Sequence, residues 1–321
     1  MPAAVAIGIF DGVHTGHRTL LGQALRLATA EQLRPVVLTF HPHPVRVLRP
    51  DRPLLLLEPL SVRLRRLQAL GFAAVHVQPF DRAFATMAPE VFMRQVLGET
   101  LQARHVVVGS NFTFGHRQGG NIGLLQERGP EQGLTLHAMP LLAANDRAII
   151  SSTLIRALVS AGDVVGAGQR LGHPVHLEGL VVHGAHRGSG FGFPTANLQV
   201  ARLCLPGRGV YAGWAHTSTG SYRAVVNIGL HPTVGDADGL KIEAHLMDYP
   251  GDALYGETLE LDLLLRLRDE QRFPSVADLL SQIGCDVAAG RAGLTAAAPS
   301  RLPPLTAANT AQLAQLPAVD A

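Results

Sequence analysis

The sequence predicts an α/β domain followed by an antiparallel β domain. Over roughly the first 150 residues, short apolar runs alternate with segments of helical periodicity, which indicates a parallel sheet with connecting helices. From about residue 175, strand-like segments separated by turn signals follow one another without a long helix between them. This second pattern favours a barrel or a sandwich. A chain of 321 residues is long enough for two domains of ordinary size.

The composition narrows the class of protein. The chain is 47% apolar and 16% charged with a net charge of +2, which gives no case for a nucleic acid or membrane partner. Lys241 is the single lysine, so a phosphate-binding loop with Gly-Lys-Ser/Thr is absent. Cys204 and Cys285 fit no metal-binding spacing. Two cysteines do not make a disulfide framework, which favours a reducing cytoplasm. No apolar run has the length of a membrane span.

The first half contains several expected elements. Strands are predicted at residues 5–7, 36–40, 73–77 and 105–108, and helices at 62–70 and 89–101. Polar clusters follow three of these strands directly. Ligands of parallel sheets bind at the carboxyl ends of the strands, so these clusters are predicted to form a site.

The first polar cluster is Gly-Ile-Phe-Asp-Gly-Val-His-Thr-Gly-His at residues 8–17. It joins a strand to a helix, and its glycines allow a sharp turn and the close approach of a ligand. The helix start can bind an anion, and His14 and His17 lie on one helical turn. The motif therefore suits a triphosphate, although a tight turn with two surface histidines is the alternative. The expected nucleotide-binding residues are Gly8, Phe10, Asp11 and Gly16.

Three further segments could complete this site. His41 and His43 alternate with prolines after the second strand, and Asn111 and Phe112 lie in a glycine-bounded loop after residue 108. A helix start follows at residues 151–156, where hydroxyl groups precede an arginine that could reach a phosphate. Its expected site residues are Ser151, Ser152 and Arg156.

The second half begins after a glycine-rich passage that ends near residue 172. Strands are predicted at 175–182, 209–216, 222–228, 241–247 and 258–267, followed by a helix at 276–289. Residues 295–321 are rich in Ala, Pro and Thr without a clear period, and we expect a disordered tail there.

A glycine-rich loop lies after the first of these strands. Its backbone amides could surround phosphate groups, and we expect Gly188, Gly192 and Pro194 to contact a nucleotide. Thr195 and Asn197 would project to one side of an extended segment, which suits a magnesium ion carrying nucleotide phosphates. Without further support, a flexible loop ending in a turn explains the glycines equally well.

Two of these motifs resemble known signatures. Residues 8–17 resemble the signature of nucleotidylyltransferases, in the form found in bacterial bifunctional riboflavin kinase/FAD synthetases, and Phe-Pro-Thr-Ala-Asn-Leu at 193–198 resembles that of riboflavin kinases. The resemblance implies a Rossmann-like nucleotidylyltransferase domain over residues 1–172. It implies an antiparallel β-barrel riboflavin kinase domain over 173–294, followed by the tail.

The resemblance also implies two reactions. The second domain would phosphorylate riboflavin to FMN with ATP and Mg²⁺, with Glu243 as the base. The first domain would adenylylate FMN to FAD and release pyrophosphate, with His14, His17 and Arg156 stabilising the transition state. The expected flavin-binding residues are His41, His43, Asn111, Phe112 and Arg268.

Alternatives remain open at this point. The chain begins only a few residues before the first signature, so an enzyme with only the kinase half active is one alternative. A nucleotidylyltransferase for another phosphorylated acceptor is a second, which the Pro-Thr-Ala-Asn element argues against. A catalytically silent flavin-binding protein is the third. We expect a cytoplasmic monomer or weak homo-oligomer whose partners are riboflavin, FMN and ATP.

Overall fold

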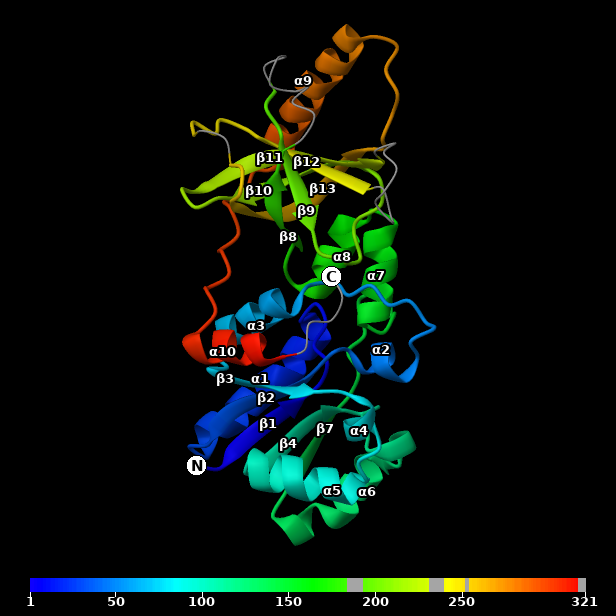
Figure 1. The fold of residues 1–321 in the computed structure, drawn as a ribbon, viewed down its shortest axis with the longest axis vertical. Helices are drawn as coiled ribbons and strands as arrows, with labels where there is room; N and C mark the ends of the chain where they lie inside the picture. The colour runs from blue at the N-terminus through cyan, green and yellow to red at the C-terminus, as the bar shows by residue number, and fades with distance from the viewer. Residues whose placement is uncertain (184–192, 231–239, 252–253, 317–321) are drawn as a thin grey trace. The chain divides into compact units, whose positions relative to one another are not determined.

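The computed structural model describes residues 1–183, 193–230, 240–251 and 254–316. The chain divides into two compact units, Met1–Ser152 with Leu302–Ala321 and Thr153–Arg301 (Figure 1). The sequence predicts a domain boundary near residue 172, whereas this division places most of α7 (Ser152–Ser160) and all of α8 (Val164–Leu171) with the second unit.

The first unit is built on a parallel sheet. Its strands are β1 (Ala3–Ile7), β2 (Arg34–His41), β3 (Ala74–Pro79), β4 (Ala103–Gly109) and β7 (Thr135–Met139). They pair in the order β3-β2-β1-β4-β7, with every pairing parallel. The strand order reverses at β1, so the carboxyl ends of β1, β2 and β4 lie side by side, where ligands of such sheets bind. β7 is not predicted from the sequence.

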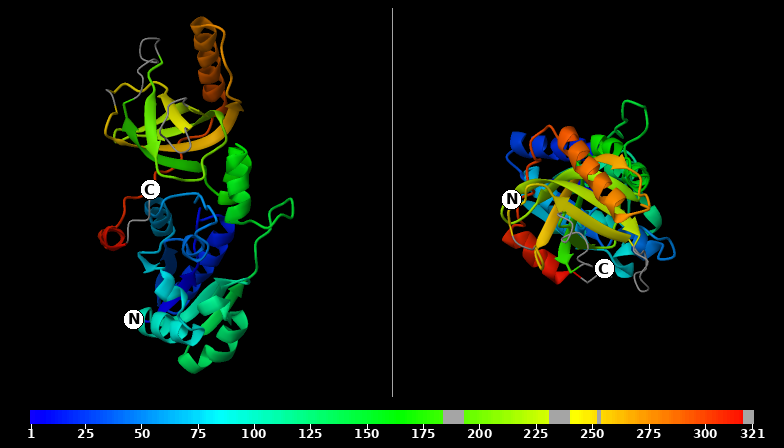
Figure 2. Two further views of the ribbon diagram at one scale, coloured as in Figure 1. Left: turned by 45° about the vertical axis from the view of Figure 1, so that its right-hand side comes forward. Right: turned by 90° about the horizontal axis from the view of Figure 1, so that it is seen from above.

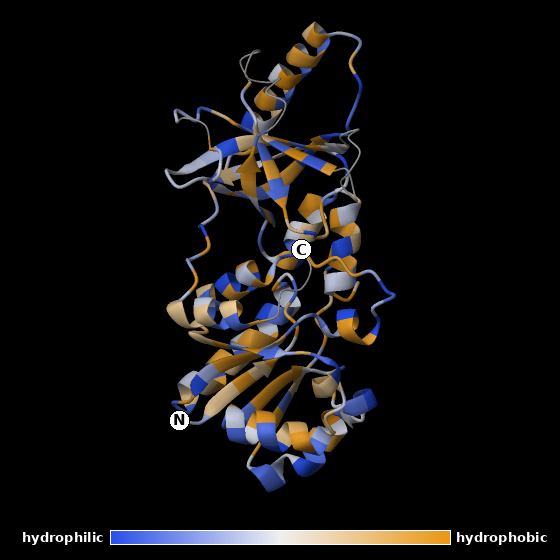
Figure 3. Ribbon diagram, in the orientation of Figure 1, coloured by the Kyte–Doolittle hydropathy of each residue, from blue (hydrophilic) through white to orange (hydrophobic). Residues whose placement is uncertain are grey.

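Helices cover both faces of this sheet (Figures 1 and 2). Their bounds are α1 (Thr15–Ala30), α2 (Pro44–Leu48), α3 (Leu60–Ala69), α4 (Arg82–Ala85), α5 (Pro89–Val91), the π-helix η1 (Phe92–Thr100) and α6 (Ile122–Arg128). Val5 of β1 packs in a cluster with residues of η1 and α6, whereas Ala6 packs in a cluster with residues of α1 and α3. Burial on both faces explains why these strands are almost wholly apolar (Figure 3).

Short elements complete the first unit. They are β5 (Thr113–Phe114), β6 (Gly120–Asn121), η2 (His116–Gln118) and η3 (Pro130–Gln132). β5 and β6 form a small antiparallel pair directly after the loop that follows β4.

The chain end differs from the expected disordered tail. Residues Ala307–Gln315 form α10, which is capped at Thr306 by its own side chain. Leu313 packs against the core cluster of the first unit, and Asn309 is buried and donates to Gln68 Oε1 at 3.0 Å. The many alanines of this segment obscure its amphipathic pattern in the sequence, but alanine is a strong helix former. Leu305, Leu313 and Leu316, in and beside the helix, pack against the core of the first unit.

The second unit is a closed antiparallel barrel, which decides between the barrel and the sandwich left open by the sequence. Its strands are β8 (Val175–Val182), β9 (Ala196–Val200), β10 (Gly209–His216), β11 (Ser221–Leu230), β12 (Leu240–Leu246) and β13 (Thr258–Arg268). They close in the order β10-β11-β12-β9-β8-β13. β9 is read from the sequence only as an extended segment, yet it fills the gap between β8 and β12.

Some barrel strands alternate apolar and polar residues, and the first half of β13 is an example (Figure 3). Leu259, Leu261 and Leu263 of β13 are almost fully buried, with the polar residues between them on the other face. The helix α9 (Val276–Gly293) packs against β10, β11 and β13 (Figure 2). Across the described part of the chain, no helix is long and apolar enough to cross a membrane.

Candidate active sites

The first candidate site surrounds the start of α1. His14 is the N-cap residue, and its Nδ1 accepts a hydrogen bond from the backbone amide of His17 at 3.2 Å. The two imidazole rings stack with centroids 3.5 Å apart, and Phe10 meets His17 edge-on at 5.2 Å. The sequence predicts two histidines on one helical turn, and the structure brings them into direct contact.

The backbone before α1 is tightly constrained. Phe10 and Val13 have positive φ angles of 55° and 39°, which residues other than glycine rarely adopt. A Cβ atom on Gly16 would lie 3.2 Å from Cε1 of His14, so a larger residue would press on that ring. At Gly8, a Cβ atom would lie 2.9 Å from the Phe10 ring. Such strain is typical of a functional turn.

Both histidines are held in the neutral form. Burial lowers the pKa of His14 to about 4, against the opposing influence of Asp11. Burial also lowers the pKa of His17 well below its usual value, and the neighbouring His14 and Arg63 lower it further. His17 Nδ1 is buried and has no hydrogen-bond partner within the described residues. The site therefore contains two neutral imidazoles, one with a buried nitrogen left for a ligand.

Asp11 and Ser152 hold the turn in place. The Asp11 carboxylate accepts the amide hydrogen of Leu57, with distances of 3.0 and 3.2 Å to its two oxygens. The Ser152 hydroxyl donates to the backbone carbonyl of Asp11 at 2.9 Å. These contacts join the motif to two distant segments, and the nucleotide contacts of Asp11, Ser151 and Ser152 stay predictions.

A buried group of charges on and before α3 is missed by the sequence analysis. Arg63 is 1% exposed and donates through Nη1 to the carbonyl of Ile9 at 3.0 Å. Its charge contributes to lowering the pKa of His41 as well as that of His17, so the guanidinium lies near both histidines. Arg66 and Glu58 form a buried ion pair at 2.7 Å beside it. Helical periodicity marks α3 as amphipathic, but it does not reveal that an arginine points inward.

The loops after β2 and β4 lie at the same edge of the sheet as α1. His43 caps α2 by accepting the Val45 amide hydrogen at 3.1 Å, and burial lowers the pKa of His41. Asn111 is exposed, while the Phe112 ring stacks on Phe114 at 5.5 Å. The structure thus places these four predicted flavin-binding residues at the carboxyl ends of β2 and β4, the strands on either side of β1. Their contact with a flavin stays a prediction, as does the role of Arg156, which lies on α7 in the second unit.

The second candidate site lies on the barrel. Asn197 of β9 pairs in register with Glu243 of β12. Asn197 is 9% exposed, and its Oδ1 has no hydrogen-bond partner among the residues that the structure describes. A buried carbonyl oxygen without a partner fits a ligand for a hard cation. Thr195 is half-buried two residues earlier, so the residue types suit the expected metal ion.

Neighbouring residues fix this site. Lys241 Nζ contacts Glu243 Oε1 at 2.6 Å, so the single lysine of the chain lies beside the expected base. His245 contacts the carbonyl of the exposed Pro194 through Nδ1 at 2.9 Å. The expected phosphate contacts Gly188 and Gly192 lie outside the described residues.

Arg268, expected to contact flavin, is held by α9. Its guanidinium contacts both carboxylate oxygens of the buried Asp286, with the shortest distance 2.7 Å. It also lies 5.7 Å from the centroid of the Phe273 ring. The sequence reveals neither partner, and the flavin contact of Arg268 stays a prediction.

Comparison with known proteins finds a matching family for each half of the chain. The family model for FAD synthetase matches residues 1–154, and the model for riboflavin kinase matches residues 171–294. The chain is 34% identical to the bifunctional riboflavin kinase/FMN adenylyltransferase of Bacillus subtilis over 290 residues, 88% of this chain and 90% of the relative. It is 35% identical to the Escherichia coli K12 enzyme of the same name over 285 residues, with the same coverage.

This chain belongs to the bifunctional riboflavin kinase/FMN adenylyltransferase family. It is an enzyme with an FAD synthetase half followed by a riboflavin kinase half, as the sequence predicts. Both activities of the family use ATP and typically need a divalent metal ion.

A solved structure has the same two-part fold. It is described as a macrolide-efflux protein from Streptococcus pneumoniae, is 31% identical to this chain, and aligns with a TM-score of 0.81. The alignment covers 90% of this chain and 94% of that structure. This similarity extends over the folds of both halves of the chain.

Proposed function

We propose that the barrel transfers the γ-phosphoryl group of ATP to the 5′-hydroxyl of riboflavin, and that the α/β unit then adenylylates the FMN formed. In the second reaction an FMN phosphate oxygen attacks the α-phosphorus of ATP, and pyrophosphate leaves. The observation that carries the proposal is the same in both units. In the signature motif of each half, a buried polar atom (His17 Nδ1 or Asn197 Oδ1) has no hydrogen-bond partner among the residues that the structure describes.

In adenylylation, the start of α1 binds the phosphates of ATP. Because His14 Nδ1 already accepts the His17 amide hydrogen, a neutral His14 carries its proton on Nε2 and can donate it to a phosphate oxygen. Negative charge on the phosphate would stabilise the protonated forms of both histidines as the transition state develops. Arg63 supplies a fixed positive charge near His17 that attracts the phosphate, although it opposes protonation of His17 itself. No covalent enzyme intermediate is needed.

In phosphorylation, the Thr195 hydroxyl and Asn197 Oδ1 would hold Mg²⁺ beside the phosphates of ATP, and the ion would supply positive charge that offsets the charge on the transferred group. Glu243 lies directly across from Asn197 and removes the proton of the flavin hydroxyl. Lys241 contacts Glu243 Oε1, so Glu243 Oε2 is the oxygen that accepts the hydroxyl proton.

A chromatographic product assay tests this function. Purified full-length protein would be incubated with riboflavin, ATP and Mg²⁺, and separately with FMN, ATP and Mg²⁺. We expect FMN and FAD from the first mixture and FAD from the second. FMN alone from the first mixture would contradict the adenylylation site, and bound flavin without any product would contradict both.

A further inference from the structure

A second cluster of polar side chains lies on the barrel strands β8 and β13. β8 pairs with β9, but the register places Val182, at the far end of β8 from His176, opposite Asn197. His176 and Glu178 belong to β8, and Glu260 and Asp262 belong to the neighbouring β13. In the antiparallel register, Glu178 lies directly opposite Glu260, and His176 lies opposite Asp262. Residues two apart on a strand share a face, so all four side chains project from the same face of the barrel.

The hydrogen bonds of Asp262 fix the orientation of His176. One carboxylate oxygen of Asp262 lies 2.8 Å from His176 Nδ1, and the other lies 3.1 Å from His216 Nε2. His216 is held in turn through Nδ1 by the Ser221 hydroxyl at 2.7 Å. A carboxylate can only accept, so His176 Nδ1 carries a proton. In the neutral ring, the lone pair is therefore on Nε2.

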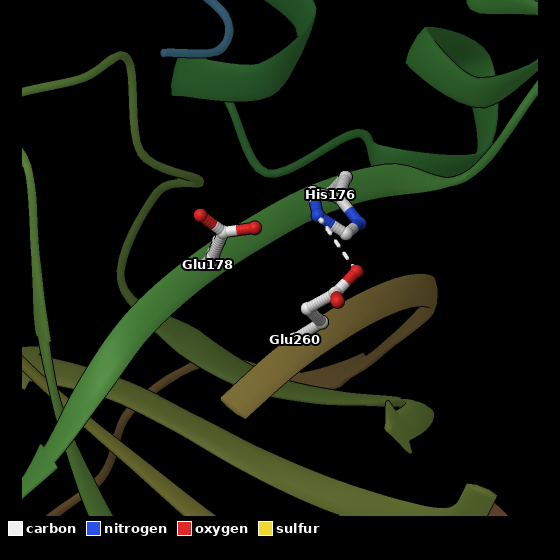
Figure 4. A group of neighbouring side chains, drawn as sticks. All are labelled: His176, Glu178 and Glu260. Atoms are coloured by element: carbon white, nitrogen blue, oxygen red, sulfur yellow. Dashed lines mark ion pairs between the residues drawn. The ribbon is translucent and has the colours of Figure 1, made fainter. Parts of the chain in front are cut away.

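Nε2 of His176 has no hydrogen-bond partner within the described residues, although the side chain is 5% exposed. It points to Glu260 Oε2 at 3.7 Å, a distance too long for a hydrogen bond. The dashed line in Figure 4 marks this ion pair. Glu178 lies beside His176 on the same strand (Figure 4). One ligand atom from each of His176, Glu178 and Glu260 lies within 4.8 Å of the others.

The charges of this cluster suit a divalent cation. Three carboxylates, Glu178, Glu260 and Asp262, belong to the cluster, and Arg301 Nη2 lies 3.3 Å from Glu260 Oε1. Glu178 and Glu260 lie directly opposite each other on neighbouring strands, and a divalent cation between them would offset the repulsion of like charges placed there.

We propose that His176 Nε2, Glu178 and Glu260 bind a divalent transition-metal ion, separate from the Mg²⁺ that accompanies ATP. The ligand atoms of a tetrahedral zinc ion are about 3.4 Å apart, because each bond is about 2.0–2.1 Å long. His176 Nε2 and Glu260 Oε2 are 3.7 Å apart, and the three ligand atoms lie within 4.8 Å of one another, so binding requires the Glu178 side chain to move toward the other two. Asp262 is the outer carboxylate that orients a metal-binding histidine. Water fills the fourth position, and the ion links β8 to β13.

Zinc binding to the full-length protein tests the site. The protein would be treated with a chelator, dialysed against ZnCl₂ without nucleotide or flavin, and analysed for bound metal and thermal midpoint. We expect the parent protein to bind one zinc ion per chain. H176Q and E178Q should each weaken this binding at least tenfold. Zinc should raise the thermal midpoint of the parent protein and not that of E178Q. D262N should weaken binding by about 10- to 100-fold, because the histidine is then held less firmly.

The matched control is H105Q, which removes another buried histidine. His105 lies in the first unit between Glu31 Oε1 at 2.9 Å and His137 Nε2 at 2.9 Å, and its loss should leave zinc binding unchanged. Circular dichroism would verify that each variant is folded. Glu178 is only partly buried, so E178Q keeps the test valid if H176Q does not fold. Failure of the parent protein to retain zinc, or equal retention by E178Q and H176Q, would overturn the proposal.

Discussion

His14 and His17 contact each other twice, through the hydrogen bond from the His17 amide to His14 Nδ1 and through rings stacked 3.5 Å apart. A change at either residue therefore alters both the helix start and the environment of the other ring. From this coupling we expect the two histidines to act as one unit in the proposed adenylylation.

His17→Ala should abolish FAD formation and leave FMN formation intact. The loss should be at least about 10²-fold, since a group that stabilises transition-state charge is removed. Product chromatography with riboflavin and with FMN measures both reactions in one experiment. The matched control is His116→Ala, an exposed histidine of the same unit. Equal loss of both products would contradict two separate sites.

The stability of the protein should depend on pH through His14. Its pKa is about 4 in the folded chain, below the ordinary value of 6.5, because burial disfavours the charged ring. Between these values the unfolded chain binds a proton that the folded chain does not. The free energy of unfolding should therefore fall as the pH drops from about 6.5 to 4, by on the order of 3 kcal/mol from this residue.

Urea unfolding at pH 6.5 and 4.5, followed by circular dichroism, checks this prediction. The parent protein should lose more stability over that interval than His14→Gln, which has no titrating group at this position. The same dependence in both proteins, or a His14 pKa near 6.5 by NMR, would count against a buried neutral ring.

Asn197→Ala should remove riboflavin phosphorylation while FAD is still formed from supplied FMN. The substitution deletes the buried Oδ1 that we assign to the metal ion. Isothermal titration with Mg²⁺ and ATP should also show weaker binding. Gln199→Ala, an exposed neighbour on β9, is the control. Normal phosphorylation by Asn197→Ala would refute the metal-binding role.

Glu243→Gln should lower the turnover number for FMN formation by about 10²- to 10⁴-fold, the usual contribution of a general base. Its KM for ATP should change little, because the amide occupies the same space. Glu257→Gln, which changes an exposed glutamate of the same unit, should have neither effect. A large rise in KM with unchanged turnover would instead assign Glu243 to binding.

Leu313→Asp should destabilise the first unit by about 2 kcal/mol. The leucine of α10 packs against the core cluster that includes α1 and α3, and a charged group there loses hydration without a partner. Thermal unfolding would measure the change, with the exposed Gln315→Asp as control. Equal midpoints for the two variants would mean that α10 contributes nothing to this unit.

The sequence by itself determined the two-domain order, the parallel and antiparallel halves, and both signature motifs. Each of these depends on local pattern, because side-chain period and turn residues are properties of neighbouring positions. The bounds of β8 and β10 agree with the sequence reading. The first residues of β8 alternate between apolar and polar, whereas β10 is a run of mostly apolar and small residues that follows a glycine-containing turn.

Only the tertiary structure decided which distant residues meet. Helix packing brings Arg63 to the carbonyl of Ile9 and Asp286 to Arg268. Strand register places Glu243 opposite Asn197, and Lys241 contacts Glu243 from the same strand. The helix α10 likewise packs on the core of the first unit, and the strands β7 and β9 pair with neighbouring strands of their sheets. Such contacts are set by topology and close packing, which no local pattern encodes.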